Sequence, residues 1–246
     1  MAVVWQKKTA TTHYEVRSAG NSLRLYTNGV FHSQYHPQQV VTGYVWDLLL
    51  LPVFFYPPKT IKRVLVLGVG GGAVIHSLQH FIAPESIDGV ELDAVHVQIA
   101  QRYFGISGAD VTLHTADAIR WVAAYTGAKF DVIIDDVFAD YEGQPVQVAE
   151  ATPQWLALLR KHLTPQGMVI KNFVDQKTLT TALRQYNIQS GFKSAFALAG
   201  LKDQNRVAVF ARANLQVSDL RKHITTMPQL VAALKSGKLK YNVRRL

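Results

Sequence analysis

The sequence predicts an α/β fold built on a doubly wound sheet with helices on both faces. From Ile61 onward, short apolar runs alternate five times with segments of helical spacing, a pattern typical of parallel strands joined by right-handed crossovers. The first run, Val64–Leu67, is continuously apolar, as a strand buried on both faces requires. Ser194–Ala199 and Arg206–Ala211 are joined by a short polar turn, so we expect an antiparallel hairpin that completes a seven-stranded sheet.

The other elements of this sheet follow in order along the chain. The remaining parallel strands are predicted at Ser86–Leu92, Val111–His114, Asp131–Asp135 and Met168–Asn172. The helices that alternate with the strands are predicted at Ala73–Phe81, Val95–Phe104, Ala118–Ala124, Pro153–Leu163 and Lys177–Ser190.

The two ends of the chain show a different pattern of polar and apolar residues. Residues 13–35 alternate polar and apolar, and the Asn28-Gly29 pair between two such runs indicates a hairpin. A small antiparallel sheet is therefore expected, followed by a helix over Gln38–Leu51, and two short helices with a basic tail are expected from Ser218 onward. The predicted division is an N-terminal β-hairpin and helix region (1–57), the α/β domain (58–214) and a helical basic extension (215–246).

The composition excludes several kinds of protein. With 48% hydrophobic and 17% charged residues, the 246-residue chain has the composition of an ordinary globular protein. Cysteine is absent, which excludes disulfides, thiolate metal sites and cysteine nucleophiles. The longest apolar run, Leu48–Tyr56, is interrupted by Pro52 and is far shorter than the roughly 20 residues of a membrane span. Since the N-terminus also lacks the apolar core of a signal peptide, we expect a cytoplasmic protein without a membrane segment.

The net charge of +9 comes from 26 Lys and Arg against 17 Asp and Glu. Such a surplus favours anionic partners. It is concentrated at the end of the chain, because residues 235–246 carry five basic residues and no acidic one. Two interpretations stay open at this point, a solvated tail or a contact with nucleic acid or another acidic surface.

A glycine-rich turn follows the first predicted strand. Gly68, Gly70, Gly71 and Gly72 precede the helix that begins at Ala73. Glycines let the backbone turn tightly and let a ligand approach it, while the N-terminus of the helix offers free N–H groups. The spacing differs from the G-x-G-x-x-G of dinucleotide-binding folds, so the turn alone identifies no ligand.

Carboxylates at the ends of the next strands indicate which kind of ligand the turn binds. Glu91 ends the second strand about 20 residues further on, where an acid accepts the ribose hydroxyls of a nucleoside. Asp117 follows the third strand and suits an adenine amine, and Asp135 and Asp136 end the fourth strand. Because ligands of open α/β sheets bind at the carboxyl ends of the strands, these acids together indicate an adenosyl-nucleoside site.

Other residues that could bind a metal, a substrate or the cofactor give weaker evidence of a site. His76 and His80 are four apart on one predicted helix, but the acid of a zinc-protease motif is missing between them, and no metal is expected. Lys171-Asn172-Phe173 ends the fifth strand and either contacts substrate or caps the sheet. Tyr44 and Trp46 either belong to the core, the usual place of aromatics at this spacing, or line the mouth of the cofactor site.

Four segments resemble the nucleoside-binding segments of class I S-adenosylmethionine-dependent methyltransferases, and within that fold most resemble the spermidine synthases: Arg63–Gly72, Gly89–Asp93, Thr115–Ala118 and Phe130–Asp136. The resemblance covers roughly residues 20–212. It implies a Rossmann-like methyltransferase sheet that binds S-adenosylmethionine or its decarboxylated form, with no metal. It also allows a homodimer paired through the N-terminal hairpin region.

The resemblance further implies roles for individual residues. Glu91, followed by Leu92, would hold the ribose, and Asp117 with Ala118 would hold the adenine. Asp136 falls on the catalytic carboxylate of the spermidine synthases. Gly68, Gly70, Gly72 and Asp135 complete the set of residues that we expect around the cofactor.

The chain departs from the spermidine synthases where those enzymes hold their cationic acceptor. The acid of their glycine loop is replaced by Gly71, their second acid after the fourth strand by Ala139, and their Tyr-His-Glu segment by Tyr44-Val45-Trp46. Burying a diamine without paired carboxylates is costly. Asp140 and Glu142 nevertheless leave the loop acidic, so a cationic acceptor stays possible.

Three functions follow as hypotheses. The first is a methyltransferase with a small-molecule acceptor that the sequence does not identify, in which positioning supplies most of the acceleration. The second is a polyamine aminopropyltransferase that uses decarboxylated S-adenosylmethionine. The third is a non-catalytic module that binds a nucleoside or, through the basic tail, nucleic acid.

Overall fold

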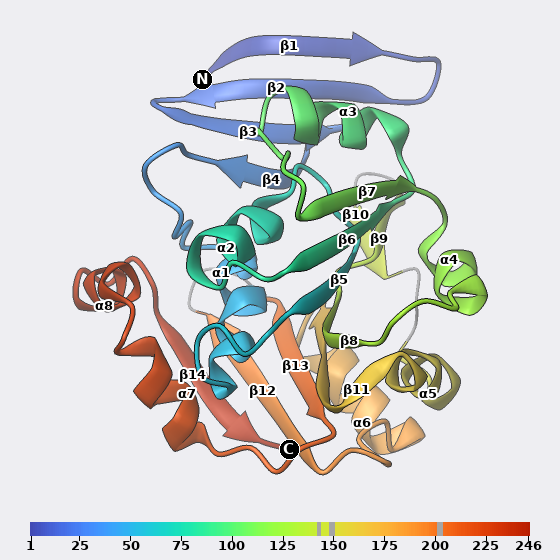
Figure 1. The fold of residues 1–246 in the computed structure, drawn as a ribbon. Coiled ribbons are helices and arrows are strands. Elements are labelled where there is room, and N and C mark those ends of the chain that lie inside the picture. Colours follow the sequence, from blue (N-terminus) through green and yellow to red (C-terminus); the bar gives the residue numbers. More distant parts are fainter. Residues whose placement is uncertain (142–143, 148–150, 201–203) are drawn as a thin grey trace.

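The computed structural model describes all residues except 142–143, 148–150 and 201–203. Its main element is an eight-stranded mixed sheet with the order β14-β12-β13-β11-β8-β5-β6-β7. A separate four-stranded antiparallel sheet, β1-β2-β3-β4, lies above α3 and the ends of the central strands (Figure 1). The predicted α/β doubly wound fold with a small N-terminal sheet is therefore confirmed, with eight central strands where seven were predicted.

The central sheet is parallel in its first part and antiparallel in its last. The parallel strands are β5 (Arg63–Leu67), β6 (Ser86–Glu91), β7 (Val111–Thr115), β8 (Phe130–Asp135) and β11 (Leu163–Phe173). The antiparallel strands are β12 (Ser194–Gly200), β13 (Arg206–Ala211) and β14 (Tyr241–Arg245).

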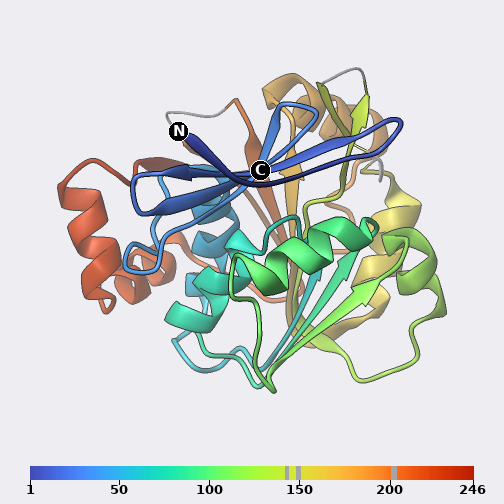
Figure 2. The same ribbon diagram turned by 90° about the horizontal axis from the view of Figure 1, so that it is seen from above.

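Helices cover both faces of this sheet (Figures 1 and 2). One face packs against α1 (Val45–Leu50), the 3₁₀ turn Leu51–Phe55, α2 (Ala73–Phe81), α7 (Val217–Ile224) and α8 (Pro228–Lys235). The other face packs against α4 (Ala118–Ala124), α5 (Pro153–Lys161) and α6 (Gln176–Tyr186). In the described part of the chain, four helices begin with a side-chain cap on a main-chain N–H, provided by Asp93, Asp117, Thr152 and Asp175.

The N-terminal sheet docks on α3. Its strands are β1 (Ala2–Lys8), β2 (His13–Ala19), β3 (Ser22–Thr27) and β4 (Val30–Tyr35), and α3 spans Ala94–Arg102. Asn28 and Gly29 connect β3 to β4 with φ of 50° and 82°, the left-handed pair that a tight hairpin turn requires, so the predicted hairpin is confirmed. Val16 and Leu25 of this sheet form a small core with Ile99 of α3.

The structure corrects the prediction at three places. The helix predicted over Gln38–Leu51 is α1 alone, followed by a 3₁₀ turn at Pro52, which has no N–H to continue an α-helix. A short hairpin follows β8, formed by β9 (Phe138–Tyr141) and β10 (Gln144–Gln147). The basic tail is strand β14, which pairs with β12.

The predicted division at residues 57 and 214 stays a prediction. Both flanking regions contribute to the core of the central sheet, because Trp46 of α1 and Leu220 of α7 belong to the same buried cluster. Among the residues that the structure describes, no helix has the length and apolarity of a membrane span.

Candidate active site

The glycine turn after β5 and Asp136 after β8 lie side by side because Gly68 has no side chain. Gly68 has φ of 81°, and a Cβ atom placed on it would collide with the main-chain oxygen of Asp136. Main-chain hydrogen bonds hold this arrangement, from Gly68 N to the oxygen of Val90 (2.9 Å) and from Asp136 N to the oxygen of Leu67 (2.9 Å). The ends of three adjacent strands, β8, β5 and β6, therefore meet at one edge of the sheet, where the rule for open α/β sheets predicts a binding crevice.

The other two predicted glycines are packed against the surrounding elements. A Cβ on Gly70 would lie 3.2 Å from the main-chain oxygen of His32 in β4, and one on Gly72 would collide with Ile106. Both residues have positive φ, 54° and 86°. Glycine is therefore required at these two positions by conformation and by space.

Glu91 holds the glycine turn. Its Oε2 accepts hydrogen bonds from the main-chain N–H groups of Val69 (3.0 Å) and Gly70 (2.9 Å), and its Oε1 accepts one from Asp93 (3.0 Å). The carboxylate thus lies at the turn, where the sequence predicts the ribose. Leu92 beside it is 70% exposed, an apolar surface available to a flat ring.

A network that the sequence does not reveal supports this carboxylate. Nδ1 of His96 in α3 is 3.8 Å from Oε1 of Glu91, and its Nε2 hydrogen-bonds Thr27 Oγ1 of β3 (2.8 Å). The Tyr14 hydroxyl of β2 donates to Asp93 (2.6 Å), and burial, followed by this hydrogen bond, raises the pKa of Tyr14 to about 12. The N-terminal sheet thereby fixes the end of β6 through contacts between residues far apart in the sequence.

Asp117 and Ala118 lie at the end of β7, as predicted. Asp117 Oδ1 accepts a hydrogen bond from the N–H of Arg120 (2.8 Å), so this residue caps α4. Ala118 is buried, whereas Ile119 is exposed. The cap fixes the Asp117 carboxylate at the same edge of the sheet as Glu91.

Asp135 lies in the core, apart from the other predicted site residues. Its Oδ2 accepts from Lys171 Nζ (2.7 Å) and from Trp155 Nε1 (2.7 Å). The side chains of Lys171 and Asp135 are 0% and 1% exposed. Of the two roles open to Lys171, the structure shows the structural one, a buried ion pair between β8 and β11.

Asp136, the residue after β8 and next to the glycine turn, is a carboxyl group of altered acidity. Burial raises its pKa to about 7, Asp135 and Glu91 add to that effect, and a hydrogen bond from Asn172 and the charge of Lys171 oppose it. Asn172 Nδ2 donates to Asp136 Oδ1 (2.8 Å). A carboxyl group that titrates near neutral pH is suited to accept a proton during a reaction.

The Asn172 amide is itself held in place. Its Oδ1 accepts a hydrogen bond from Asn205 Nδ2 (3.0 Å), which fixes the amide with its NH₂ toward Asp136. Asn172 is buried, and it lies on β11 while Asn205 precedes β13. The sequence places Asn172 at the crevice, but Asn205 has no recognisable signal because its contact depends on strand order.

Ser33 of β4 fills the space beside Gly71, where spermidine synthases carry an acid. A Cβ on Gly71 would lie 2.8 Å from Ser33 Cβ and 3.2 Å from Phe104 Cδ1. Position 71 therefore has no free space for a side chain. Trp46 is buried against Phe31, with ring centroids 5.2 Å apart, and belongs to the core. Glu142 lies outside the described residues.

We expect Gly71→Asp to destabilise the protein by about 1–3 kcal/mol, because the added side chain overpacks the contact with β4. Combining it with Ser33→Gly should recover most of that loss. Urea unfolding of both variants, with Ser33→Gly alone as the control, measures the coupling. Equal destabilisation with and without Ser33 would show that β4 does not restrict this position.

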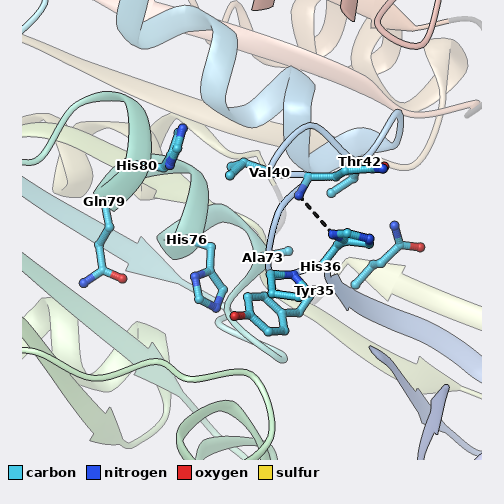
Figure 3. A pocket seen from close by; sticks show the side chains of 11 residues that line it. Tyr35, His36, Val40, Thr42, Ala73, His76, Gln79 and His80 are labelled. Atoms are coloured by element: carbon cyan, nitrogen blue, oxygen red, sulfur yellow. Dashed lines mark hydrogen bonds between the residues drawn. The ribbon is translucent and has the colours of Figure 1, made fainter. Parts of the chain in front are cut away.

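A separate cavity of about 390 Å³ lies between α2 and the segment that follows β4 (Figure 3). His76 and His80 face it from α2, and Tyr35 stacks on His76 with ring centroids 4.5 Å apart. His36 Nδ1 accepts hydrogen bonds from the N–H groups that follow it in the chain. The described residues contain no group of three or more His, Cys, Asp or Glu side chains placed to hold a metal.

Comparison with known sequences places these features in a family context. A family model described as spermine/spermidine synthase domain matches residues 43–200. The polyamine aminopropyltransferase of Vibrio vulnificus is 30% identical over 139 residues, 55% of this chain and 45% of that protein. The human eEF1A lysine and N-terminal methyltransferase is 30% identical over 146 residues, 55% of this chain and 20% of that protein. The chain thus spans less than half the length of these relatives.

Solved structures show the same fold. A probable spermidine synthase from Corynebacterium glutamicum superposes with a TM-score of 0.76 and 18% identity, covering 100% of this chain and 91% of that one. Human methyltransferase-like protein 13 in complex with SAH superposes with a TM-score of 0.60 and 22% identity, covering 76% and 90% of the two chains. One fold therefore underlies both groups of neighbours.

Proposed function

The chain belongs to the spermine/spermidine synthase domain family, and from this premise we propose that it is an S-adenosylmethionine-dependent transferase, with methyl as the transferred group. The observation that carries the proposal is the Asp136 carboxyl group, whose pKa is raised to about 7 beside the glycine turn. In this proposal the donor binds at the glycine turn, and the carboxyl group beside it accepts the proton.

The residues present fit an adenosyl donor. Gly68 and Gly70 have little room for a side chain, and the N–H groups of Val69 and Gly70 bind the carboxylate of Glu91. In the proposed complex Glu91 and Leu92 hold the ribose, Asp117 and Ala118 hold the adenine, and Gly68, Gly70 and Gly72 line the turn. Asp135 lies behind the site in the core, where its ion pair with Lys171 holds the end of β8 against β11. The bound donor supplies a methyl group activated by a sulfonium.

The chain's own contribution to the reaction is positioning and proton removal. Asp136 lies at the carboxyl edge of β8 with its Oδ1 fixed by Asn172. In its ionised form it accepts the proton that an amine or hydroxyl acceptor loses on transfer. Holding donor and acceptor in line supplies most of the acceleration, because attack on a sulfonium needs no covalent help from the protein.

Methyl transfer is favoured over aminopropyl transfer by the acceptor side of the crevice. Ser33 occupies the space beside Gly71, so the acid that spermidine synthases carry there is absent and has no room. An aminopropyltransferase remains the second candidate, since Asp136 falls on the catalytic carboxylate of that family and a relative carries that name. Methyl transfer is supported by another relative, which is named as a lysine and N-terminal methyltransferase.

Calorimetric titration with the two donors tests the proposal. We expect S-adenosylmethionine to bind more tightly than its decarboxylated form, and Glu91→Gln to weaken binding about tenfold or more, because a charged hydrogen-bond acceptor is lost. Glu85→Gln is the matched control, since Glu85 is exposed and forms an exposed ion pair with Lys62. Tighter binding of the decarboxylated donor together with turnover of putrescine would contradict methyl transfer, and failure to bind either donor would contradict the transferase.

A further inference from the structure

The basic tail of the sequence forms an open edge of the central sheet. Strand β14 is the terminal strand in the sheet order, and among the described residues it pairs with β12 alone. Figure 1 shows it on the outer side of β12, below α8. A free edge of this kind presents unpaired main-chain donors and acceptors along its length.

The register decides which main-chain groups point outward. Leu246 N donates to the oxygen of Ala195 in β12 (2.9 Å). In an antiparallel pair the bonded positions alternate, so Arg244, opposite Ala197, also points its main-chain groups toward β12. The N–H and C=O groups of Val243 and Arg245 therefore face away from the sheet. Within the described part of the chain they have no main-chain partner.

A basic groove runs beside this edge, between β14 and α6. Its volume is about 680 Å³. It is lined by Gln176, Thr180, Leu183, Arg184, Gln189, Arg244, Arg245 and Leu246. None of these side chains is acidic, and the three guanidinium groups make no ion pair with any described carboxylate. Their charge is therefore available to a partner.

The groove lies in the part of the chain that carries the whole charge surplus. Residues 176–246 contain 13 Lys and Arg against two Asp and no Glu. Basic side chains along an edge strand repel a second copy of the same edge. They attract an acidic chain, and Arg binds carboxylates with a planar fork of donors.

We propose that this edge binds an extended acidic segment of a partner protein, which adds a strand next to β14. Main-chain groups of Val243 and Arg245 pair with the segment, and its alternate carboxylates face Arg244 and Arg184 on the α6 side. A peptide is favoured over nucleic acid because only a peptide uses the free strand edge. The described residues that line the groove also include no aromatic ring on which a base could stack.

Fluorescence anisotropy with labelled peptides tests the proposal. The probe is a short peptide in which Glu alternates with Thr, and the comparison peptide has the same composition arranged as a Glu block and a Thr block. The alternating peptide should bind more tightly. Arg244→Glu and Arg184→Glu should each weaken binding about tenfold, since a contact charge is reversed. Lys129→Glu, an exposed residue before β8, is the matched control and should leave binding unchanged apart from a small effect of net charge.

A backbone variant separates strand pairing from attraction between charges. Val243→Pro removes an outward N–H and leaves the bonds from β14 to β12, a position where an edge strand tolerates proline. Val243→Pro should weaken binding of the alternating peptide and have little effect on binding of the block peptide. Equal binding of the two peptides, tighter binding of an oligouridine of matching charge, or no binding of either peptide would overturn the proposal. Donor binding is measured on the same variants and should not change, so the proposed transferase function is tested independently.

Discussion

Replacing Asp136 with Asn should slow transfer strongly and at the same time make the folded protein more stable. The loss of a general base lowers the rate by about 10²–10⁴-fold. The gain in stability follows from the pKa of Asp136, which burial raises from 3.8 to about 7. A difference of that size corresponds to at most roughly 4 kcal/mol, and the partial exposure of the side chain reduces it to about 2–3 kcal/mol.

The stability gained by Asp136→Asn depends on pH, because the pKa of Asp136 is raised in the folded state. The folded state keeps the proton on Asp136 to higher pH than the unfolded state, so ionisation costs stability as the pH rises from about 4 to about 7. The free-energy difference between Asp136→Asn and the unchanged protein should therefore be largest above pH 7. It should decrease as the pH falls and vanish below about pH 3, where Asp136 is protonated in both the folded and the unfolded state of the unchanged protein.

Denaturant unfolding at several pH values measures this difference, and initial rates with the identified acceptor measure the loss of activity. Asp110→Asn is the matched control, because Asp110 lies away from the crevice and accepts a hydrogen bond from Gln79 that an amide oxygen also accepts. A variant at position 136 that keeps full activity would remove Asp136 from the mechanism. A variant that is less stable than the unchanged protein at pH 8 would contradict the burial argument.

Lys171→Met should be the most destabilising single substitution near the site. Lys171 and Asp135 form an ion pair with exposures of 0% and 1%, and removing one partner leaves a buried charge without compensation. Such losses cost about 3–5 kcal/mol. Asp136 is the next residue in the chain, so movement of Asp135 would also displace the Asp136 carboxylate.

A double variant and a surface control make this prediction specific. Asp135→Asn with Lys171→Met removes both charges and keeps an acceptor for Trp155 Nε1, so it should be less destabilised than Lys171→Met alone. Lys62→Met breaks the exposed pair with Glu85 and should cost at most about 1 kcal/mol. Urea unfolding curves of the three proteins give the comparison. Equal losses for the buried and exposed pairs would mean that burial does not determine the cost.

The parallel part of the sheet is predictable because its signals are local. The helices Ala73–Phe81 and Ala118–Ala124 and the strand Arg206–Ala211 lie where the sequence places them, since an apolar run or a cap residue defines each end. Strand β14 was not predicted, because Tyr241 and Val243 alternate with polar residues over too few positions to outweigh the basic side chains. Its stability comes from β12, which is a non-local contact.

The candidate site was predictable in its carboxylates and less so in their partners. Glu91 and Asp136 end their strands at the crevice, as the rule for open α/β sheets predicts. The rule does not reveal that the neighbouring Asp135 points into the core toward Lys171, because adjacent residues of a strand face opposite sides. Nor does it reveal His96 or Asn205, whose roles arise from packing between distant segments.

The docking of the N-terminal sheet has a thermodynamic consequence for the proposed donor site. Ser33 of β4 accepts a hydrogen bond from Ala73 N at the start of α2, and β3 reaches Glu91 through His96. Docking of the sheet and binding of the donor therefore share residues and are linked equilibria. Linkage is reciprocal, so whatever factor the docked sheet adds to donor affinity, the donor adds to the docking of the sheet. A substitution on the remote face of β2 or β3 that loosens the sheet is thus also a change in affinity for the donor.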